Sequence, residues 1–500
     1  MRTLVPAETL VYLETNDLAG ALQPIVDSKP FTEVAKSKPD FSALKGVQLA
    51  VAVTGFETSE EKLTDEHSVG RVQPHFVAVA DTHAWNYQAV AFAEKKLGSF
   101  VTEIYDSEPT LEKSNKNGGK YFIWKAKDGR KAYALVIDSI IYFGNDETAI
   151  DKCLAVKRGE ADSVAKSGKV QTAAPGTLAS GYVGPDGIAQ IANIIGLKFA
   201  SEVGEDSEVQ SAIAGILPQL LRNSITDVTW TATKTEQGIE DRYIVTILPD
   251  IASVFNETLK PSDSDSPAIE FIPADAPTAT YYNLRDPMVS WRSILLTGQK
   301  QAGPRASVLF EEFSKALFAP YGIRDPEMFL SGAGTNILTA NLDADGEKPV
   351  VIAEVMNPEK IRKSLLIDTR PYQQWPADLE VQFRTSSDGD LAAAFIERYI
   401  VVGDADSVRT CVKQKLKKVD AKGGAYFGLL GEPKRAAATI GTDVTSARQI
   451  VDIISGEKSD NGNPRSTFFT ETRFTKTGIE RRTISDFGLI GSIIAQLAQD

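Results

Sequence analysis

Three short motifs in the chain have the residue types of a serine acyl-transfer site. Ser163 and Lys166 form a Ser-x-x-Lys sequence, residues 459–461 read Ser-Asp-Asn, and residues 476–478 read Lys-Thr-Gly. Serine β-lactamases and penicillin-binding proteins use this set to supply and activate a nucleophile. Here the second and third motifs are too close in sequence for that fold, and the first follows a polar connector in the other half of the chain. We therefore expect no catalysis from them.

The three histidines are the next candidates, because imidazole is a common metal ligand. They are His67, His75 and His83, and all lie in the first half of the chain. We expect His67 in a polar loop, His75 at the start of a strand and His83 at the start of a helix. Such dispersed positions do not form a coordination sphere, so we predict no metal site.

Two glycine-containing segments resemble binding loops without matching them. Residues 343–346 (Asp-Ala-Asp-Gly), followed by Glu354, resemble a calcium-binding loop, but the glycine is misplaced and strands flank the segment. Gly332 and Gly334 lack the third glycine of a dinucleotide fingerprint and precede a strand. We predict a hairpin turn at 343–346 and expect no cofactor.

Two cysteines, Cys153 and Cys411, are too few for a disulfide framework or a zinc ribbon. Both fall on the apolar stripe of a predicted helix, where a cysteine behaves as a small apolar side chain. We expect inert buried thiols. Asn256 begins a formal glycosylation sequon, but nothing else indicates a eukaryotic secretory protein.

The composition is that of an acidic globular protein. The 500 residues include 54 Lys and Arg against 67 Asp and Glu, which gives a formal charge of -13, and 42% of the residues are hydrophobic. Nucleic acids and anionic membranes are bound by clustered basic side chains. The balance of charge therefore argues against both as partners.

Five sequence blocks recur in the same order in the two halves of the chain. The spacing within them is kept to one residue: Asp128 and Asp388 are 260 positions apart, and Gly144 and Gly403 are 259 apart. The paired blocks are 5–8 with 272–275, 121–144 with 381–403, 145–154 with 404–412, 182–195 with 439–454, and 234–240 with 476–480. Such a repeat predicts a tandem duplication.

The duplication sets the predicted domain organisation. We predict a first repeat domain over residues 1–258, a polar linker bounded by prolines over 259–267, and a second repeat domain over 268–500. Residues 1–255 and 268–500 should each be expressible alone.

The pattern of short alternating segments and Asp-Gly turns indicates antiparallel strands joined by hairpins. Residues 48–53 and 76–80 read as strands, and the polar stretch 57–73 between them reads as a mobile loop. We predict α+β domains, each mainly an antiparallel sheet with helices on one face, rather than a Rossmann or TIM fold. Residues 488–497 should form a C-terminal helix that packs on its own domain.

The sequence carries no apolar run of about 18 residues that would span a bilayer. It also shows no apolar leader after Met1. We expect either a cytoplasmic protein or an exported one whose leader is absent from this sequence.

Two motifs suggest a family. A Pro-Ala-Asp/Glu opening occurs at residues 6–8 and 273–275, and a glycine-acidic turn before a helix occurs at 144–146 and 403–405. The chain resembles uncharacterised bacterial families, domains of unknown function, found in exported or membrane-anchored proteins. This resemblance implies an extracytoplasmic protein, periplasmic or on the cell surface, with no established enzyme activity.

We therefore expect a non-catalytic extracytoplasmic binding or structural protein, with no catalytic, cofactor-binding or metal-binding residues. Its partner would be a protein or a cell-envelope component, not a nucleic acid. The alternative is a hydrolase-type enzyme of unrecognised family with its site at the domain interface.

Overall fold

The computed structural model describes most of the chain and divides it into two compact units. The described residues are 1–62, 68–170, 174–202, 216, 218–263, 267–273, 276–303, 310, 314–367, 373–374, 381–417, 430, 435–443, 445–456, 464 and 466–496. Unit 1 comprises residues 1–243, 445–464 and 486–500, and unit 2 comprises 244–444 and 465–485. Neither unit is a single stretch of chain.

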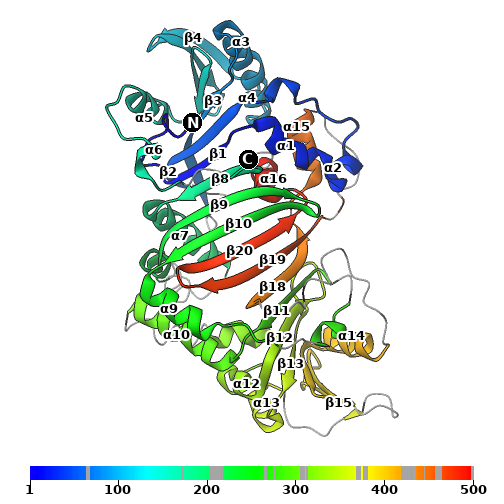
Figure 1. The fold of residues 1–500 in the computed structure, drawn as a ribbon. Coiled ribbons are helices and arrows are strands. Elements are labelled where there is room, and N and C mark those ends of the chain that lie inside the picture. The colour runs from blue at the N-terminus through cyan, green and yellow to red at the C-terminus, as the bar shows by residue number, and fades with distance from the viewer. Residues whose placement is uncertain are drawn as a thin grey trace. The chain divides into compact units, whose positions relative to one another are not determined.

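Unit 1 is built on an antiparallel sheet (Figure 1). Along the sheet the strands follow the order β4 (Thr110–Lys116), β5 (Gly119–Lys125), β6 (Lys131–Ile137), β7 (Ile140–Gly144), β3 (Ser68–Asp81), β2 (Gln48–Lys62), β1 (Val11–Thr15), β8 (Thr177–Val183), β9 (Ile225–Thr235) and β10 (Gly238–Ile247). The β10 strand begins in unit 1 and ends in unit 2.

Helices cover both faces of this sheet. Tyr142 and Phe143 are neighbours in β7 and point to opposite faces, yet both are buried. Tyr142 packs with α5 (Glu147–Lys157), whereas Phe143 packs with α3 (Asn86–Phe92), η2 (Ala93–Leu97) and α4 (Gly98–Ile104). The prediction of helices on one face is therefore wrong, because continuous apolar runs such as that in β7 need cover on both sides.

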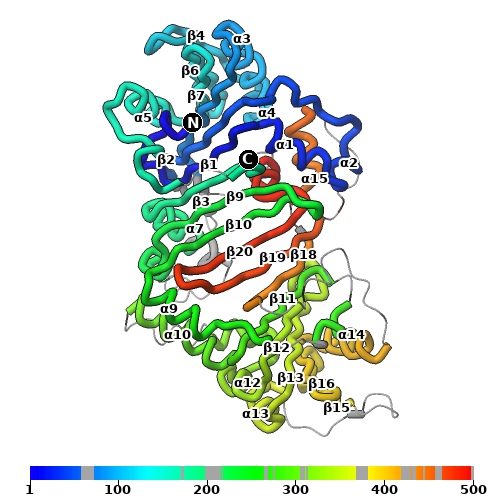
Figure 2. Tube along the Cα trace, viewed as in Figure 1, coloured from blue at the N-terminus to red at the C-terminus, as the bar shows by residue number. Residues whose placement is uncertain are grey.

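A third buried cluster of unit 1 contains helices from both ends of the chain. Trp230 and Ile239 of β9 and β10 pack there with α1 (Leu18–Asp27), α2 (Lys29–Val34), α15 (Ala447–Ser455) and α16 (Gly488–Gln496). Figure 2 shows the orange α15 beside the blue α2. The predicted C-terminal helix is confirmed, and it packs both on α15 of its own predicted repeat and on strands of the first half.

Unit 2 contains a second series of antiparallel strands. Its strand order is β14 (Gln373–Gln374), β15 (Val381–Thr385), β16 (Leu391–Ile396), β17 (Tyr399–Asp404), β13 (Pro349–Val355), β12 (Ala333–Asn341), β11 (Thr278–Asn283), β18 (Ala437–Asp443), β19 (Ser466–Thr475) and β20 (Gly478–Ser485). The predicted α+β class with antiparallel sheets is thus confirmed in both units.

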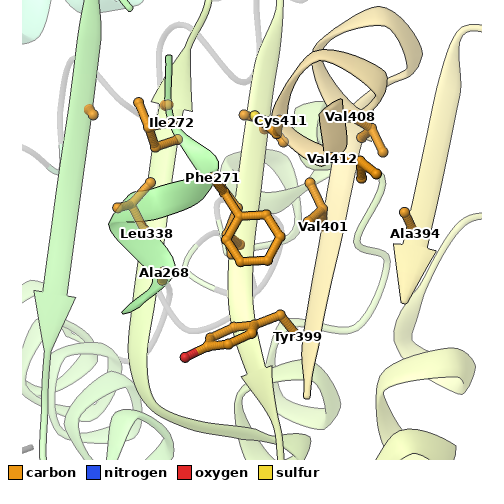
Figure 3. Packing of buried hydrophobic residues seen from close by; sticks show 14 of the residues in the cluster. Ala268, Phe271, Ile272, Leu338, Ala394, Tyr399, Val401, Val408, Cys411 and Val412 are labelled. Atoms are coloured by element: carbon orange, nitrogen blue, oxygen red, sulfur yellow. The ribbon is translucent and has the colours of Figure 1, made fainter. Parts of the chain in front are cut away.

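Both faces of the unit 2 sheet are also buried. Val401 packs with α14 (Ala405–Leu416) and η3 (Pro267–Phe271), in the cluster drawn in Figure 3. The next residue, Val402, packs with α12 (Pro326–Gly332) and α13 (Pro358–Ser364). In addition, α9 (Pro249–Thr258) contacts β19, β20 and α10 (Pro287–Ala302). The sheet is therefore enclosed as in unit 1.

The observed turns between strands lie where the sequence predicts them, with one exception. Residues 236–237 and 476–477 connect β9 to β10 and β19 to β20, and Asp343 stabilises the β12–β13 turn by accepting from the backbone nitrogens of Glu347 and Lys348. The predicted loop at 57–73 is wrong in part: β2 and β3 stay in register from Glu57 with Gln73 to Lys62 with Ser68. Backbone pairing there overrides the polar composition.

The described part of the predicted linker is bound to unit 2. Pro261 forms a bridge with Leu284, and Asn283 donates through Nδ2 to the carbonyl of Ser262 at 2.9 Å. The compact units do not follow the predicted boundaries, since α15 and α16 belong to unit 1 and α9 to unit 2. The boundaries of the sequence repeats stay a prediction.

Four helices of the described residues remain. They are η1 (Ser42–Leu44), α6 (Val164–Ser167), α7 (Pro185–Glu202) and η4 (Ala319–Tyr321). In the part of the chain that the structure describes, no helix has the length and apolarity needed to cross a membrane.

Candidate functional site

The motifs that resemble a serine acyl-transfer site have structural roles where they are described. Ser163 is buried at the start of α6, and Lys166 turns its ammonium to Asp162 at 3.2 Å. Residues 476–478 form the β19–β20 turn, and 459–461 lie outside the described residues. Since Lys166 is bonded to a carboxylate on the surface, it is not placed as a base for Ser163.

The two described histidines face carboxylates at the surface of unit 1. His75 lies on β3 with Nε2 3.3 Å from Glu57 Oε2 and Nδ1 3.5 Å from Asp146 Oδ2. His83 Nδ1 is 3.5 Å from Asp81 Oδ1, and His67 lies outside the described residues. Over the described ranges, no three His, Cys, Asp or Glu residues are grouped to hold a metal ion.

The two cysteines are free and buried, one in each unit. Cys153 lies on α5 and Cys411 on α14, each within an apolar cluster. Burial raises the pKa of both thiols to about 12. Both stay protonated near neutral pH and cannot act as thiolate nucleophiles.

A buried carboxylate organises the middle of the unit 1 sheet. Glu14 on β1 accepts through Oε1 from Arg2 Nε at 2.7 Å and from Ser180 Oγ at 3.2 Å, and through Oε2 from the Tyr12 hydroxyl at 2.8 Å. Burial alone would raise the pKa of Glu14, but the hydrogen bonds from Arg2 and Tyr12 outweigh it and lower the pKa. The group is therefore an ionised structural anchor.

A second buried carboxylate lies in unit 2. Glu471 on β19 is 2% exposed and forms ion pairs with Arg435, Arg482 and Arg473, with N–O distances of 2.5, 2.8 and 3.2 Å. Arg482 is its direct partner on β20. The carboxylate thus ties β19 to β20 and to the segment that precedes β18.

Hydroxyl groups form a polar row across the same sheet. Five threonines are consecutive cross-strand partners on β12, β11, β18, β19 and β20: Thr339, Thr280, Thr439, Thr470 and Thr483. Two hydroxyl pairs bond within the row, at 3.1 Å and 2.9 Å. The row is partly or fully buried, and these two bonds involve four of its five hydroxyls.

The clearest outward-facing feature is a loop of unit 1 with two aromatic side chains, which we name the aromatic loop (residues 81–88). Trp85 is 74% exposed and Tyr87 is 69% exposed, the two largest values for aromatic side chains among the described residues. Its residues run from the end of β3 into the first turn of α3, so Trp85 directly precedes the helix and Tyr87 lies in its first turn. Aromatic side chains are enriched at binding surfaces, because each contributes a large contact area with few rotatable bonds.

The aromatic loop is held by its own hydrogen bonds. His83 N donates to Asp81 Oδ1 at 3.0 Å, and Trp85 N donates to Gln88 Oε1 at 3.1 Å. His83 has a φ of 50°, an uncommon backbone conformation that these bonds help to fix. The backbone that carries Trp85 is therefore set before any partner arrives.

The β6–β7 turn (residues 138–139) holds the aromatic loop through hydrogen bonds. Thr82 donates to the carbonyl of Ser139 through both N (3.1 Å) and Oγ1 (2.8 Å), and Ser139 Oγ donates to Asp81 Oδ1 at 2.8 Å. Asn86 Nδ2 donates to the carbonyl of Asp138 at 3.2 Å. Since this turn belongs to the unit 1 sheet, the segment that carries the two rings is held by a rigid element.

The sequence reasoning did not single out Trp85 and Tyr87. The available signal was a Trp-Asn-Tyr sequence directly after a strand, among the polar residues Thr82, His83 and Gln88. The neighbouring residues show no apolar periodicity that would place these aromatic side chains on a buried face, so the sequence indicates that they are exposed. Their rigid support depends on the β6–β7 turn, which is distant in sequence.

Comparisons with known proteins do not assign the chain to a family. No family model matches it, and no curated protein matches it. A solved structure, crystal form IV of TP0453, matches with 11% identity and a TM-score of 0.25, over 51% of this chain and 84% of that chain. Crystal form I of TP0453 matches with 8% identity and a TM-score of 0.23, over 47% of this chain and all of the other. Likeness at this level carries no argument about fold or function.

Proposed function

We propose that this chain is a non-catalytic binding protein of the bacterial cell envelope that contacts its partner through the aromatic loop. The observation that carries the proposal is the exposure of Trp85, just before α3, and of Tyr87, in its first turn, on a segment fixed by hydrogen bonds. Binding at a preformed loop avoids most of the entropy cost of ordering it. An envelope location rests on the sequence resemblance to exported bacterial families.

Tandem duplication is part of the same proposal. It is supported by the strand orders of the two units, which coincide when each first-half strand is paired with the strand ten positions later in the numbering. It is also supported by Gly144 and Gly403. A Cβ at either residue would lie 2.2 to 2.3 Å from a backbone oxygen of the adjacent strand, at Phe76 or Pro349.

The aromatic loop gives the first repeat a feature that the second lacks at the matching place. In unit 2, β13 is followed by Met356, Asn357 and α13, with no aromatic side chain between them. This difference is consistent with a binding protein in which only the first repeat carries the aromatic side chains that contact the partner.

Site-specific photo-cross-linking in cells tests the proposal. A photoreactive residue at position 87 should form a discrete adduct, and Trp85→Ala should abolish it because Trp85 supplies the adjacent contact area. The same residue at position 99, which is exposed on α4, is the matched control and should give no adduct. Equal adducts at both positions, or an adduct indifferent to Trp85→Ala, would contradict the proposal.

A further inference from the structure

We propose that the ligand of the aromatic loop is a neutral oligosaccharide, an inference that rests on the proposed function. The two rings are more than two-thirds exposed and are separated by one residue. A pyranose ring presents a face of C–H groups that packs on an aromatic ring, while its hydroxyls point outward from the rim. Trp85 and Tyr87 offer two such surfaces on one loop.

The polar groups beside the rings suit hydroxyl partners. Asn86 uses Nδ2 to hold Asp138, and Gln88 uses Oε1 to hold Trp85 N. Within the described residues, Asn86 Oδ1 and Gln88 Nε2 have no such protein bond, so one acceptor and one donor remain on exposed side chains. A sugar hydroxyl both donates and accepts, and can use either group.

The charge of the loop favours a neutral ligand over an anionic one. Residues 81–88 contain no Lys or Arg, and the supporting turn adds the carboxylate of Asp138. A phosphate or an anionic lipid surface would need cationic side chains here. The whole chain is also acidic, at -13, which opposes approach of an anion.

The surroundings favour a sugar over a protein partner. At protein interfaces the aromatic anchors lie within a fully desolvated apolar core. Here the exposed neighbours His83, Asn86 and Gln88 are polar, so each ring stands alone among hydrogen-bonding groups. Isolated rings with polar neighbours match the alternation of C–H faces and hydroxyls along a glycan.

Titration of the full chain with neutral oligosaccharides tests the inference. The probes are chitotetraose, cellotetraose and maltotetraose, followed by isothermal calorimetry. At least one should bind, and Trp85→Ala should weaken it by about tenfold or more, the loss typical of a binding hot spot. Trp85→Phe, which keeps a ring, should lose less. Met356→Ala removes an equally exposed apolar side chain in unit 2 and should change nothing.

Two results would overturn the inference, and they separate it from the proposed function. If no probe binds and the cross-linked adduct at position 87 is a protein, the saccharide inference fails while the binding loop stands. If no probe binds and no adduct forms, both fail. Unchanged circular dichroism in Trp85→Ala excludes misfolding as the cause of lost binding.

Discussion

At the scale of single residues, the buried charges of this chain work as anchors. Glu14 and Glu471 each lie within a sheet and each accepts several donors. A buried carboxylate is tolerable only when it is paired in this way, since an unpaired charge costs several kcal/mol. The ionisable groups of the interior therefore fix strand positions.

The lowered pKa of Glu14 makes unit 1 sensitive to acid. A carboxyl whose pKa is lower in the folded state contributes stability above its ordinary value of 4.5 and loses it as the pH falls through the folded value. We predict that Glu14→Gln lowers the free energy of unfolding by about 1 to 3 kcal/mol near neutral pH, because Arg2 loses its counter-charge.

Urea unfolding at several pH values measures this effect. The difference between wild type and Glu14→Gln should shrink as the pH falls below 4.5, because the carboxyl of the unfolded wild-type chain takes up a proton first, and that of the folded chain only at lower pH. Glu8→Gln, an exposed glutamate of the same segment, should show no such difference. A difference that stays constant with pH would show that Glu14 does not act through its charge.

At the scale of elements, one side chain of the first half caps a helix of the second. Asp241 on β10 is 2% exposed and accepts from Trp230 Nε1 and from the backbone nitrogen of Leu489, both at 2.8 Å. The second bond satisfies one of the free N–H groups at the start of α16. The carboxylate therefore joins the hairpin to the C-terminal helix.

Removing this carboxylate should loosen α16. We predict that Asp241→Ala costs about 2 to 4 kcal/mol, because two buried donors lose a charged acceptor. Hydrogen exchange should show faster exchange at the α16 amides, with β4 to β7 unchanged. Asp250→Ala, an exposed aspartate in the first turn of α9, is the control and should leave α16 protected. Unaltered protection of α16 in Asp241→Ala would refute the capping role.

The elements themselves were largely readable from the sequence, and their partners were not. Hairpins at Asp343 and at 476–478 have turn chemistry that is local, so the pattern predicted them. Tyr142 and Phe143 are buried on opposite faces of the sheet, but in the sequence they appear only as part of a continuous apolar run. Such a run has no polar–apolar alternation, so it does not show that both faces are covered. The aromatic loop was missed because its support comes from Ser139, more than fifty residues later.

At the scale of the whole molecule, segments that are distant in the sequence pack in the same compact unit. Unit 1 includes α15 and α16, which begin about two hundred residues or more after the end of β10, and unit 2 includes α9 from the first half. Sequence similarity between the two halves predicts repeats, but it cannot tell on which half a helix packs, because the apolar stripe of a helix does not identify its partner.

Because helices of each half pack in the unit formed mainly by the other half, the two predicted repeats should not be stable when they are expressed separately. A fragment of residues 1–258 lacks α15 and α16, which cover Trp230 and Ile239 in the third cluster of unit 1. We predict that the fragment lacks the cooperative thermal transition of the intact chain. Its tryptophan emission should be shifted to longer wavelength than that of the intact chain. Residues 268–500 lack α9 and should also be destabilised, since α9 contacts β19 and β20.

Co-expression of the two fragments supplies the control. Because each fragment carries the helix that the other's strands require, the pair should co-purify and regain the blue-shifted emission and cooperative melting of the intact chain. Asp241→Ala in fragment 1–258 should weaken this association, since it removes the cap of α16. If 1–258 alone melts cooperatively with native emission, then α15 and α16 are dispensable, and the repeats are independent domains as the sequence alone suggested.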